Sequence, residues 1–283
     1  MQYRELGRTG SRVSVIGMGG IVVSGMSQDE ASRTVRSAID RGVTYFDFSP
    51  TYGNSEELLG PAIEGKRDKL FLACKTTKRD RAGAKEELER SLKRLRTDHF
   101  DLYQLHGVPN LKDLRQALGP DGAMEAISDA KSRGQVRHVG ITTHQTEVAL
   151  EGLKSFDFDS VLFPVNFVCW LRADVGPEVL EAAAKKGAGR LAIKSMALRP
   201  WPEGANHKWN KAWYQPIDDP ALARLAVRFT LTRDVAAMLP PGHLELWEMA
   251  MSAADDGRPL EPDEMVELSR VAAAHEPVMK KVG

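Results

Sequence analysis

Four ionisable side chains follow short apolar runs in the N-terminal part of the chain. Asp47 and Tyr52 lie in FDFSPTYG, Lys75 ends FLACK and His106 ends LYQLH. A lysine ammonium beside a tyrosine hydroxyl stabilises the phenolate and lowers the tyrosine pKa, and a nearby carboxylate fixes the direction of the lysine. A histidine could donate a hydrogen bond that polarises a carbonyl. The set indicates proton transfer to a carbonyl oxygen, with Tyr52 as the donor.

Each of these residues also has an ordinary structural interpretation. An aspartate after a strand often caps a turn or a helix, and a lysine or histidine at a strand end is often solvated or simply packed. The catalytic interpretation gains weight because all four groups are expected at the same ends of adjacent strands. The sequence shows no nucleophile elbow, paired carboxylates or metal-ligand spacing. We therefore expect no metal, and a cofactor that delivers a hydride.

The elements that must position these residues alternate regularly along the chain. Apolar runs begin at residues 13, 43, 70, 100, 137, 160, 190 and 235, and segments with helical periodicity span 30–42, 84–95, 122–134 and 177–187. Near-continuous apolar runs are typical of strands buried on both faces of a parallel sheet. We predict an α/β fold, a (β/α)8 TIM barrel that forms a single domain over residues 1–283. A doubly wound open sheet is the alternative, although no GxGxxG turn follows the first strand.

Local signals sharpen this prediction. Ser27 and Glu30 have the spacing of a capping box, and Gly42, Gly134 and Gly187 stand where left-handed helix ends are expected. The segment before residue 13 contains turn glycines and predicts a short N-terminal β-hairpin at the bottom of the barrel. The C-terminal stretch after residue 260 predicts a closing helix and a short tail.

Composition limits the partners. The chain has 39 Lys and Arg against 39 Asp and Glu, which argues against nonspecific binding to nucleic acid or to an anionic membrane. Its two cysteines, Cys74 and Cys169, have no zinc-site spacing, and no apolar run approaches a membrane span. We expect a cytoplasmic protein that acts on a small carbonyl or alcohol and binds neither nucleic acid nor membrane. Its oligomeric state is left open.

In their order and spacing, FDFSPTYG, FLACK and LYQLHG resemble the Asp, Tyr, Lys and His tetrad of the aldo-keto reductases. The segments YRELGRTGSRVSVIGMGG and RGQVRHVGIT resemble that family too. The resemblance implies a nicotinamide cofactor across the barrel mouth and the reduction of aldehydes or ketones, reversible as alcohol oxidation. It implies that Tyr52 is the general acid, that Lys75 and Asp47 tune it, and that His106 orients the substrate.

The resemblance also implies cofactor-binding positions, which match the family less well than the tetrad does. They are Gly20, Thr142, Thr143, Asn166, Lys194, Ser195, Met196, Gly242 and His243. Thr142 and Thr143 replace the usual Ser-Asn pair, and Asn166 is the polar residue nearest to a usual glutamine. Ile193 or Lys194 stands where many members stack an aromatic ring on the nicotinamide.

The segment LPPGHLELWEMAM resembles the family's adenosine-phosphate loop, where Gly242 and His243 could present N–H groups to a phosphate. Glu245 and Glu248 follow, whereas a 2′-phosphate normally needs Lys or Arg. NADP(H) is the family default, so it stays slightly favoured over NAD(H). The aromatic stretch 199–220 predicts a flap over the cofactor, a wall of the substrate pocket or a protein interface.

Two other functions stay open at this point. One is a Schiff-base lyase, in which Lys75 or Lys194 attacks a carbonyl. The other is a nucleotide-sensing binding module with little turnover.

Overall fold

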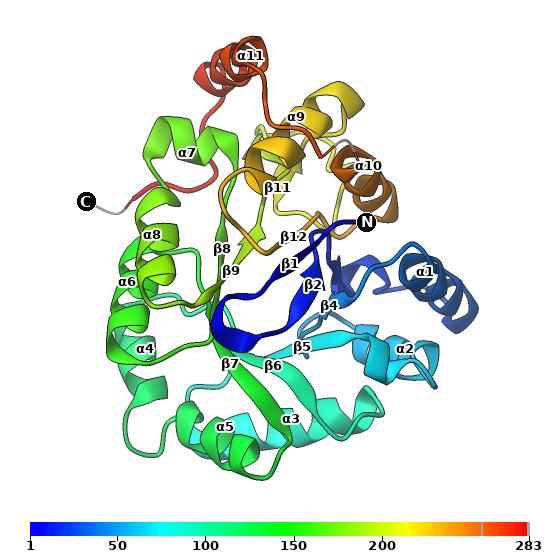
Figure 1. The fold of residues 1–283 in the computed structure, drawn as a ribbon, viewed down its shortest axis with the longest axis vertical. Coiled ribbons are helices and arrows are strands. Elements are labelled where there is room, and N and C mark those ends of the chain that lie inside the picture. The colour runs from blue at the N-terminus through cyan, green and yellow to red at the C-terminus, as the bar shows by residue number, and fades with distance from the viewer. Residues whose placement is uncertain (256, 282–283) are drawn as a thin grey trace.

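A parallel β-sheet that curves into a barrel occupies the centre of the molecule (Figure 1). The structure is a computed structural model that describes residues 1–255 and 257–281. Each strand pairs with the next one along the chain, in the order β3-β4-β5-β6-β7-β8-β9-β12. The strands are β3 (Met18–Gly19), β4 (Tyr45–Asp47), β5 (Phe71–Thr76), β6 (Phe100–Leu105), β7 (Val136–Thr142), β8 (Ser160–Pro164), β9 (Gly189–Ile193) and β12 (Ala237–Leu239). All eight predicted runs thus contribute a barrel strand, which confirms the (β/α)8 prediction.

Backbone contacts between the first and last strands close the barrel. Ile16 forms a parallel bridge with Met238. Gly17 N donates to Met238 O at 2.9 Å, and Met238 N donates to Val15 O at 2.9 Å. Because the two edges of the sheet meet in this way, the alternative of an open doubly wound sheet is wrong.

The first predicted run is divided between two structures. Its beginning belongs to β2 (Arg12–Ser14), which pairs antiparallel with β1 (Tyr3–Glu5) in the predicted N-terminal hairpin. The hairpin connection contains the 3-10 helix η1 (Gly7–Thr9). Arg8 N donates to Gly187 O at 2.8 Å, just before β9, so the hairpin covers the amino ends of the barrel strands. The chain then bends before β3, where Ser14 Oγ donates to Ile16 O at 2.8 Å.

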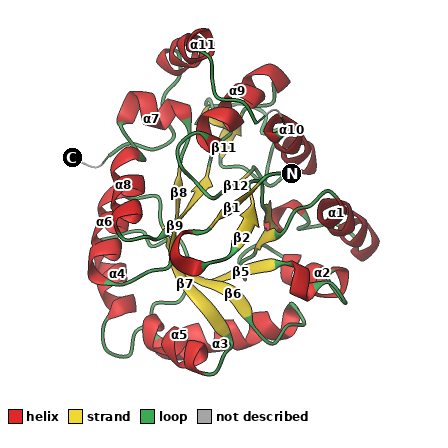
Figure 2. Cartoon of the chain, in the orientation of Figure 1, coloured by secondary structure: helices red, strands yellow, loops and turns green. Residues whose placement is uncertain are grey.

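Helices surround the strands in a ring (Figure 2). They are α1 (Gln28–Asp40), α2 (Ser55–Ala62), α3 (Arg81–Arg94), α4 (Leu111–Leu118), α5 (Ala123–Ser132), α6 (Thr146–Ser155), α7 (Phe167–Ala173), α8 (Pro177–Lys185), α9 (Pro220–Leu231), α10 (Leu244–Ala254) and α11 (Pro262–Ala273), with short 3-10 helices η2 (Gly20–Val22) and η3 (Arg67–Lys69). The capping box of Ser27 and Glu30 starts α1 as predicted. Helix α3 begins three residues before the predicted segment because the Asp80 side chain caps it, accepting from Gly83 N at 2.8 Å.

The predicted left-handed helix ends are also present. Gly42, Gly134 and Gly187 have φ of +87°, +75° and +67°, a backbone conformation that costs glycine little. Helix α11 is the predicted closing helix. Among the described residues, no helix is long and apolar enough to cross a membrane.

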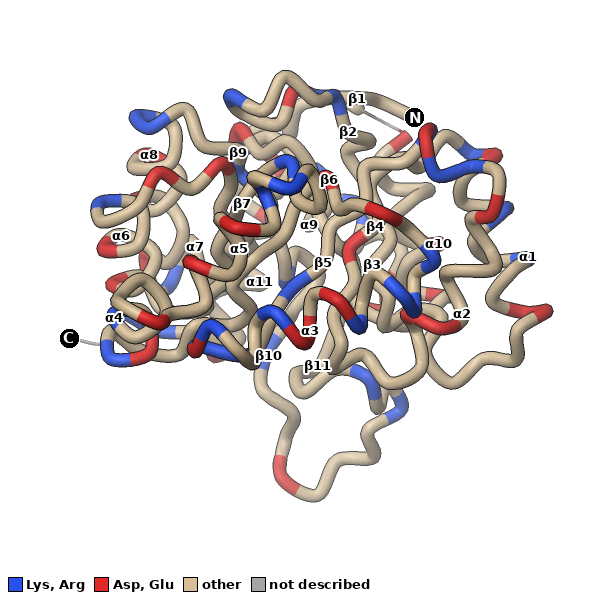
Figure 3. The backbone as a smooth tube through the Cα atoms, turned by 90° about the horizontal axis from the view of Figure 1, so that it is seen from below, with Lys and Arg blue, Asp and Glu red and all other residues tan. Residues whose placement is uncertain are grey.

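One connection has a structure that the sequence did not predict. Strands β10 (Ala197–Pro200) and β11 (Tyr214–Pro216) pair antiparallel and carry between them a loop of residues 201–213, named the 201–213 loop below. Figure 3 shows this loop at the end of the barrel opposite the β1–β2 hairpin, with acidic and basic residues interspersed over the whole chain. The loop therefore lies at the carboxyl ends of the barrel strands, where TIM barrels place their active sites.

Candidate active site

A cavity of about 280 Å³ lies between the carboxyl ends of the strands and the 201–213 loop. Asp47, Tyr52, Lys75 and His106 all line it. The structure thus brings together the four residues that the sequence singled out, from β4, β5 and the segments that follow β4 and β6. Within the described ranges, no group of three or more His, Cys, Asp or Glu side chains could hold a metal ion.

A buried ion pair anchors the site. The Lys75 ammonium contacts the Asp47 carboxylate, and each side chain is only 1% exposed. Lys75 Nζ also donates to Phe48 O at 3.1 Å. The second oxygen of Asp47, Oδ2, accepts from Tyr45 OH at 3.0 Å and from Gln104 Nε2 at 3.1 Å. A buried ion pair needs such additional hydrogen bonds to offset its desolvation, and here they hold the lysine in one direction.

Tyr52 lies close to this pair. Lys75 Nζ is 5.2 Å from the centre of the Tyr52 ring. Burial raises the pKa of Tyr52, Lys75 opposes that rise, and the net pKa is above the usual value. The prediction of a net lowering was therefore wrong, because it considered the cation and left out the desolvation of a partly buried phenol. Tyr52 carries its proton at neutral pH, as a general acid must.

The pKa of Lys75 moves the other way from what burial alone would cause. Burial lowers it, but Asp47 and Tyr52 outweigh that effect and raise the pKa of the ammonium. Lys75 therefore stays charged at neutral pH. A charged Lys75 stabilises any negative charge that develops on the Tyr52 oxygen when the proton leaves.

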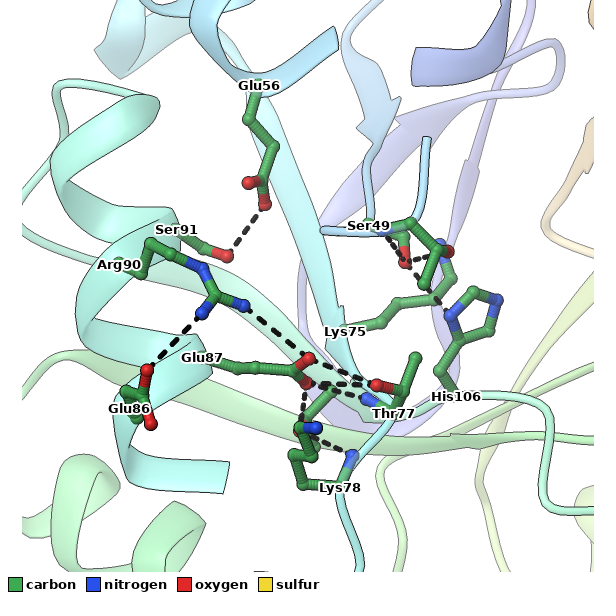
Figure 4. A network of polar contacts seen from close by, with 12 residues as sticks. Ser49, Glu56, Lys75, Thr77, Lys78, Glu86, Glu87, Arg90, Ser91 and His106 are labelled. Atoms are coloured by element: carbon green, nitrogen blue, oxygen red, sulfur yellow. Dashed lines mark hydrogen bonds and ion pairs between the residues drawn. The ribbon is translucent and has the colours of Figure 1, made fainter. Parts of the chain in front are cut away.

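His106 is held as a neutral ring. Its Nδ1 is hydrogen-bonded to Ser49 Oγ at 2.9 Å (Figure 4). Burial and the nearby Lys75 and Arg79 cations lower the pKa of His106 to about 3. When the Ser49 hydroxyl donates to Nδ1, the single ring hydrogen is on Nε2. The imidazole then donates a hydrogen bond as a neutral group, without bringing a charge into the cavity.

Sequence reasoning missed the residues that support the tetrad. Ser49 follows Asp47 by two positions and binds His106, and Gln104 precedes His106 by two positions and binds Asp47. Gln104 carried a usable signal, because a glutamine inside a fully buried strand needs a buried partner. Ser49 offered no such signal, because serines are common in loops.

A second polar network fixes the chain just beyond Lys75 (Figure 4). Glu87 of α3 accepts from Thr76 Oγ1 at 2.7 Å and from Thr77 N at 2.8 Å. The Glu87 carboxylate is buried and thus ties the end of β5 to α3. This network lies behind the cavity and does not line it.

The predicted cofactor residues divide into two groups. Thr142, Lys194 and Gly242 line the cavity, whereas Gly20, Thr143, Asn166, Ser195, Met196 and His243 are not part of its wall. Thr142 Oγ1 accepts from Gly107 N at 2.6 Å, and Thr143 Oγ1 donates to Val108 O at 2.7 Å. Thr142 is the last residue of β7 and faces the cavity, whereas Thr143 follows the strand and its hydroxyl is bound to Val108 O.

The residues behind the wall have structural contacts of their own. A Cβ on Gly20 would come within 2.5 Å of the Phe48 ring, so the glycine permits this packing. Asn166 Oδ1 caps α7 by accepting from Cys169 N at 2.8 Å. The Met196 carbonyl accepts from Ile217 N at 2.8 Å. These contacts leave Asn166 Nδ2 and Ser195 Oγ buried without a hydrogen-bond partner in the described structure.

These features fit a bound dinucleotide. Helix α10 starts after His243 without a side-chain cap, and Gly242 directly before it lines the cavity. The free N–H groups and dipole at a helix start favour a phosphate. The unpartnered Asn166 and Ser195 groups follow the carboxyl ends of β8 and β9, but they lie behind the cavity wall. Gly242 is therefore the residue of these three that could hold a cofactor phosphate, and the roles of Asn166 and Ser195 stay predictions.

The 201–213 loop is tied across the cavity mouth. Lys211 Nζ donates to the carbonyl oxygens of Ile21, Val22 and Ser24 at 3.1, 3.2 and 2.8 Å. Lys211 N donates to His243 Nε2 at 3.1 Å. Trp213, at the end of the loop, lines the cavity and is 54% exposed. The loop thus forms a wall of the pocket, one of the roles expected for it.

Comparison with known proteins agrees with this geometry. The family model "Aldo/keto reductase family" matches residues 15–218. The L-galactose dehydrogenase of Arabidopsis thaliana is 31% identical over 235 residues, which are 75% of this chain and 70% of that protein. Aldo-keto reductase YhdN of Bacillus subtilis is 34% identical over 166 residues, 52% of this chain and 48% of that protein. The chain therefore spans about half the length of this relative.

Solved structures extend the likeness over nearly the whole chain. The holo form of an aldo-keto reductase from Bacillus halodurans superposes with a TM-score of 0.75 and 25% identity, covering 96% of each chain. The barrel, the placement of the tetrad on one cavity and the family-model match all point in the same direction. The chain belongs to the aldo-keto reductase family, whose members are oxidoreductases that use nicotinamide cofactors.

Proposed function

We propose that the protein reduces a small aldehyde or ketone with a nicotinamide cofactor, and that it oxidises the corresponding alcohol in reverse. The observation that carries this proposal is the placement of a protonated Tyr52 beside a charged Lys75 and a neutral His106 on one cavity wall. A proton donor, a cation that stabilises the resulting phenolate and a neutral hydrogen-bond donor are what carbonyl reduction requires.

The residues act in a defined order. His106 Nε2 and the Tyr52 hydroxyl hold the carbonyl oxygen between them. A nicotinamide cofactor, when bound, would supply the hydride for the carbonyl carbon. As charge develops on the oxygen, Tyr52 transfers its proton, and Lys75 stabilises the tyrosine oxygen that is left behind. Asp47 keeps the Lys75 ammonium in place through Oδ1, and Gln104 holds Asp47 by donating to Oδ2.

The competing functions fit this site less well. A Schiff base at Lys75 requires a neutral amine, whereas the Asp47 carboxylate keeps that lysine charged. A binding module with little turnover does not require the tetrad to be assembled. For the cofactor, NADP(H) stays slightly favoured over NAD(H). Glu245 and Glu248 weaken this preference, although Arg41 pairs with Glu248 beside α10.

In the first test, the purified protein is titrated with NADPH and with NADH in parallel, and binding is monitored by tryptophan fluorescence. In the second, oxidation of the cofactor is measured with a panel of small aldehydes and ketones. We expect binding of a cofactor and carbonyl-dependent oxidation. In Tyr52→Phe we expect turnover to fall by roughly 10²-fold or more while cofactor affinity stays unchanged. Cofactor binding without turnover on the whole panel would instead support the sensing module.

A further inference from the structure

Lys194 differs from the other cations of the cavity wall. Lys75 is paired with Asp47, and the Lys211 ammonium donates to three backbone carbonyl oxygens. In the part of the chain that the structure describes, the Lys194 ammonium has neither a hydrogen bond nor a carboxylate partner. Its ammonium contacts two aromatic rings, at 5.4 Å from the centre of the Trp213 ring and 5.0 Å from that of Tyr214.

The backbone holds Lys194 in an unusual conformation. Its φ is +64°, in the left-handed region that residues with a Cβ adopt at a cost of about 1 kcal/mol. A turn follows directly, in which Ala197 N donates to Lys194 O at 2.8 Å. This turn ends β9 and starts β10, so the lysine is placed on the wall below Trp213. A strained residue at a cavity wall points to a function for its side chain.

The cavity provides no anion for this cation. Asp47 is the one carboxylate among the lining residues that the structure describes, and Lys75, Tyr45 and Gln104 already occupy it. Burial lowers the pKa of Lys194 to about 8, so the charged form still predominates at pH 7. A partly buried, unpaired charge is unfavourable, and an anionic ligand relieves it.

We propose that Lys194 determines substrate specificity by binding a carboxylate on the carbonyl compound. The preferred substrates are then aldehydes or ketones that carry a carboxylate, with the carbonyl at Tyr52 and His106 and the acid group at Lys194. This inference rests on the proposed function of the site. Ile193, Leu162 and Trp213 also line the cavity and offer apolar surface for the carbon skeleton.

A phosphate of the cofactor is the other anion that could bind Lys194. The location of Lys194 favours the substrate. Lys194 lines the same cavity as His106, the residue proposed to face the carbonyl. The phosphate site expected from the start of α10 is instead at Gly242.

The kinetic test compares substrates that differ only in their charge. One rigid pair is 4-carboxybenzaldehyde and methyl 4-formylbenzoate, and one flexible pair is 4-oxobutanoate and its methyl ester. We expect the acid of at least one pair to have the higher kcat/KM. In Lys194→Met this preference should fall by about tenfold, mainly through a higher KM for the acid, because one charge-assisted hydrogen bond is lost. Lys194→Arg should retain the preference.

The control is Lys208→Met. Lys208 lies in the 201–213 loop with its ammonium 4.3 Å from the centre of the Trp209 ring, but it does not line the cavity. This variant should keep the preference for the acid. Equal kcat/KM for acid and ester in the wild type, or an unchanged preference in Lys194→Met, would overturn the proposal. The proposal would also be overturned if Lys194→Met bound the cofactor more weakly and lost kcat/KM equally for acid and ester. That result would assign Lys194 to a cofactor phosphate.

A binding measurement separates this proposal from the proposed function. Calorimetry with the product alcohol 4-(hydroxymethyl)benzoate, and with its methyl ester, requires no turnover. We expect the acid to bind more tightly than the ester to the wild type, and this difference to disappear in Lys194→Met. If no carbonyl is turned over but the acid still binds through Lys194, the proposed reduction fails and the carboxylate site stands. Covalent trapping of an aldehyde on Lys194 by borohydride would overturn the carboxylate site and favour a Schiff base.

The pH dependence adds a further check. The titratable groups that line the cavity with Lys194 are His144, Tyr214, Lys211 and the tetrad. Burial lowers the pKa of His144 to about 4 and raises that of Tyr214, so neither changes charge between pH 6 and 9. Binding of the acid should therefore weaken as the pH rises above about 8, where Lys194 loses its proton. Constant affinity across that range would contradict the role of Lys194.

Discussion

Ser49 Oγ lies 2.9 Å from His106 Nδ1, so a serine that follows β4 sets the orientation of a histidine that follows β6. A further bond of 2.9 Å joins Ser49 Oγ to Thr51 Oγ1. These contacts link the two loops that carry Tyr52 and His106. The hydrogen on His106 Nε2, and with it the direction of the hydrogen bond to the substrate, depends on this serine.

Removal of the Ser49 hydroxyl should therefore weaken catalysis. In Ser49→Ala, His106 can rotate or change tautomer, and we expect kcat/KM to fall about tenfold, by the loss of one buried hydrogen bond. Cofactor affinity should not change. Steady-state kinetics with a titration of the cofactor measures both quantities, and Ser49→Thr, which keeps the hydroxyl, should recover most of the activity. A loss of cofactor affinity equal to the loss of activity would contradict a role through His106.

Loss of the Lys75 charge should affect both activity and stability. Lys75→Met leaves the Asp47 carboxylate buried without its cation, and removing one partner of a buried pair costs about 3–5 kcal/mol. We expect the free energy of unfolding in urea to fall by that order and turnover to be lost. The double variant Asp47→Asn with Lys75→Met should recover stability but not turnover. Full activity of Lys75→Met at neutral pH would contradict the role assigned to the cation.

The partly buried His144 predicts how stability depends on pH. The folded pKa of His144 is lowered to about 4, whereas an unfolded histidine titrates near 6.5. Below pH 6.5 the unfolded chain therefore binds a proton that the folded chain does not, and stability is lost as the pH falls towards 4. His144→Gln should lose less stability than the wild type between pH 7 and pH 5, by roughly 1–2 kcal/mol. Urea unfolding at the two pH values measures this difference, and identical losses would contradict the assigned burial.

The ties of Lys211 predict that the 201–213 loop opens when they are removed. Lys211→Met cannot donate to the carbonyl oxygens of Ile21, Val22 and Ser24. We expect faster cleavage of the loop by a protease in limiting amount, and a higher KM for the substrate. Lys208→Met in the same loop serves as the control. Unchanged cleavage would mean that the aromatic contacts of the loop hold it without the lysine.

The sequence alone determined the barrel and the residues of the tetrad. Apolar runs, capping residues such as Ser27 and turn glycines such as Gly42 act through local geometry, which can be recognised in the order of residues. The expectation that Asp47, Tyr52, Lys75 and His106 come together then followed from the rule that parallel strands present their carboxyl ends at one face.

The tertiary structure decided which neighbours of these residues face the cavity and what charge each group carries. Thr142 lines the cavity and Thr143 does not, and Lys194 lines it while Ser195 is behind it. The twist and closure of the barrel select the inward residue of each such pair, and a sequence contains no direct measure of either. The sign of the Tyr52 pKa shift was decided in the same way, because desolvation depends on everything that encloses the ring in three dimensions.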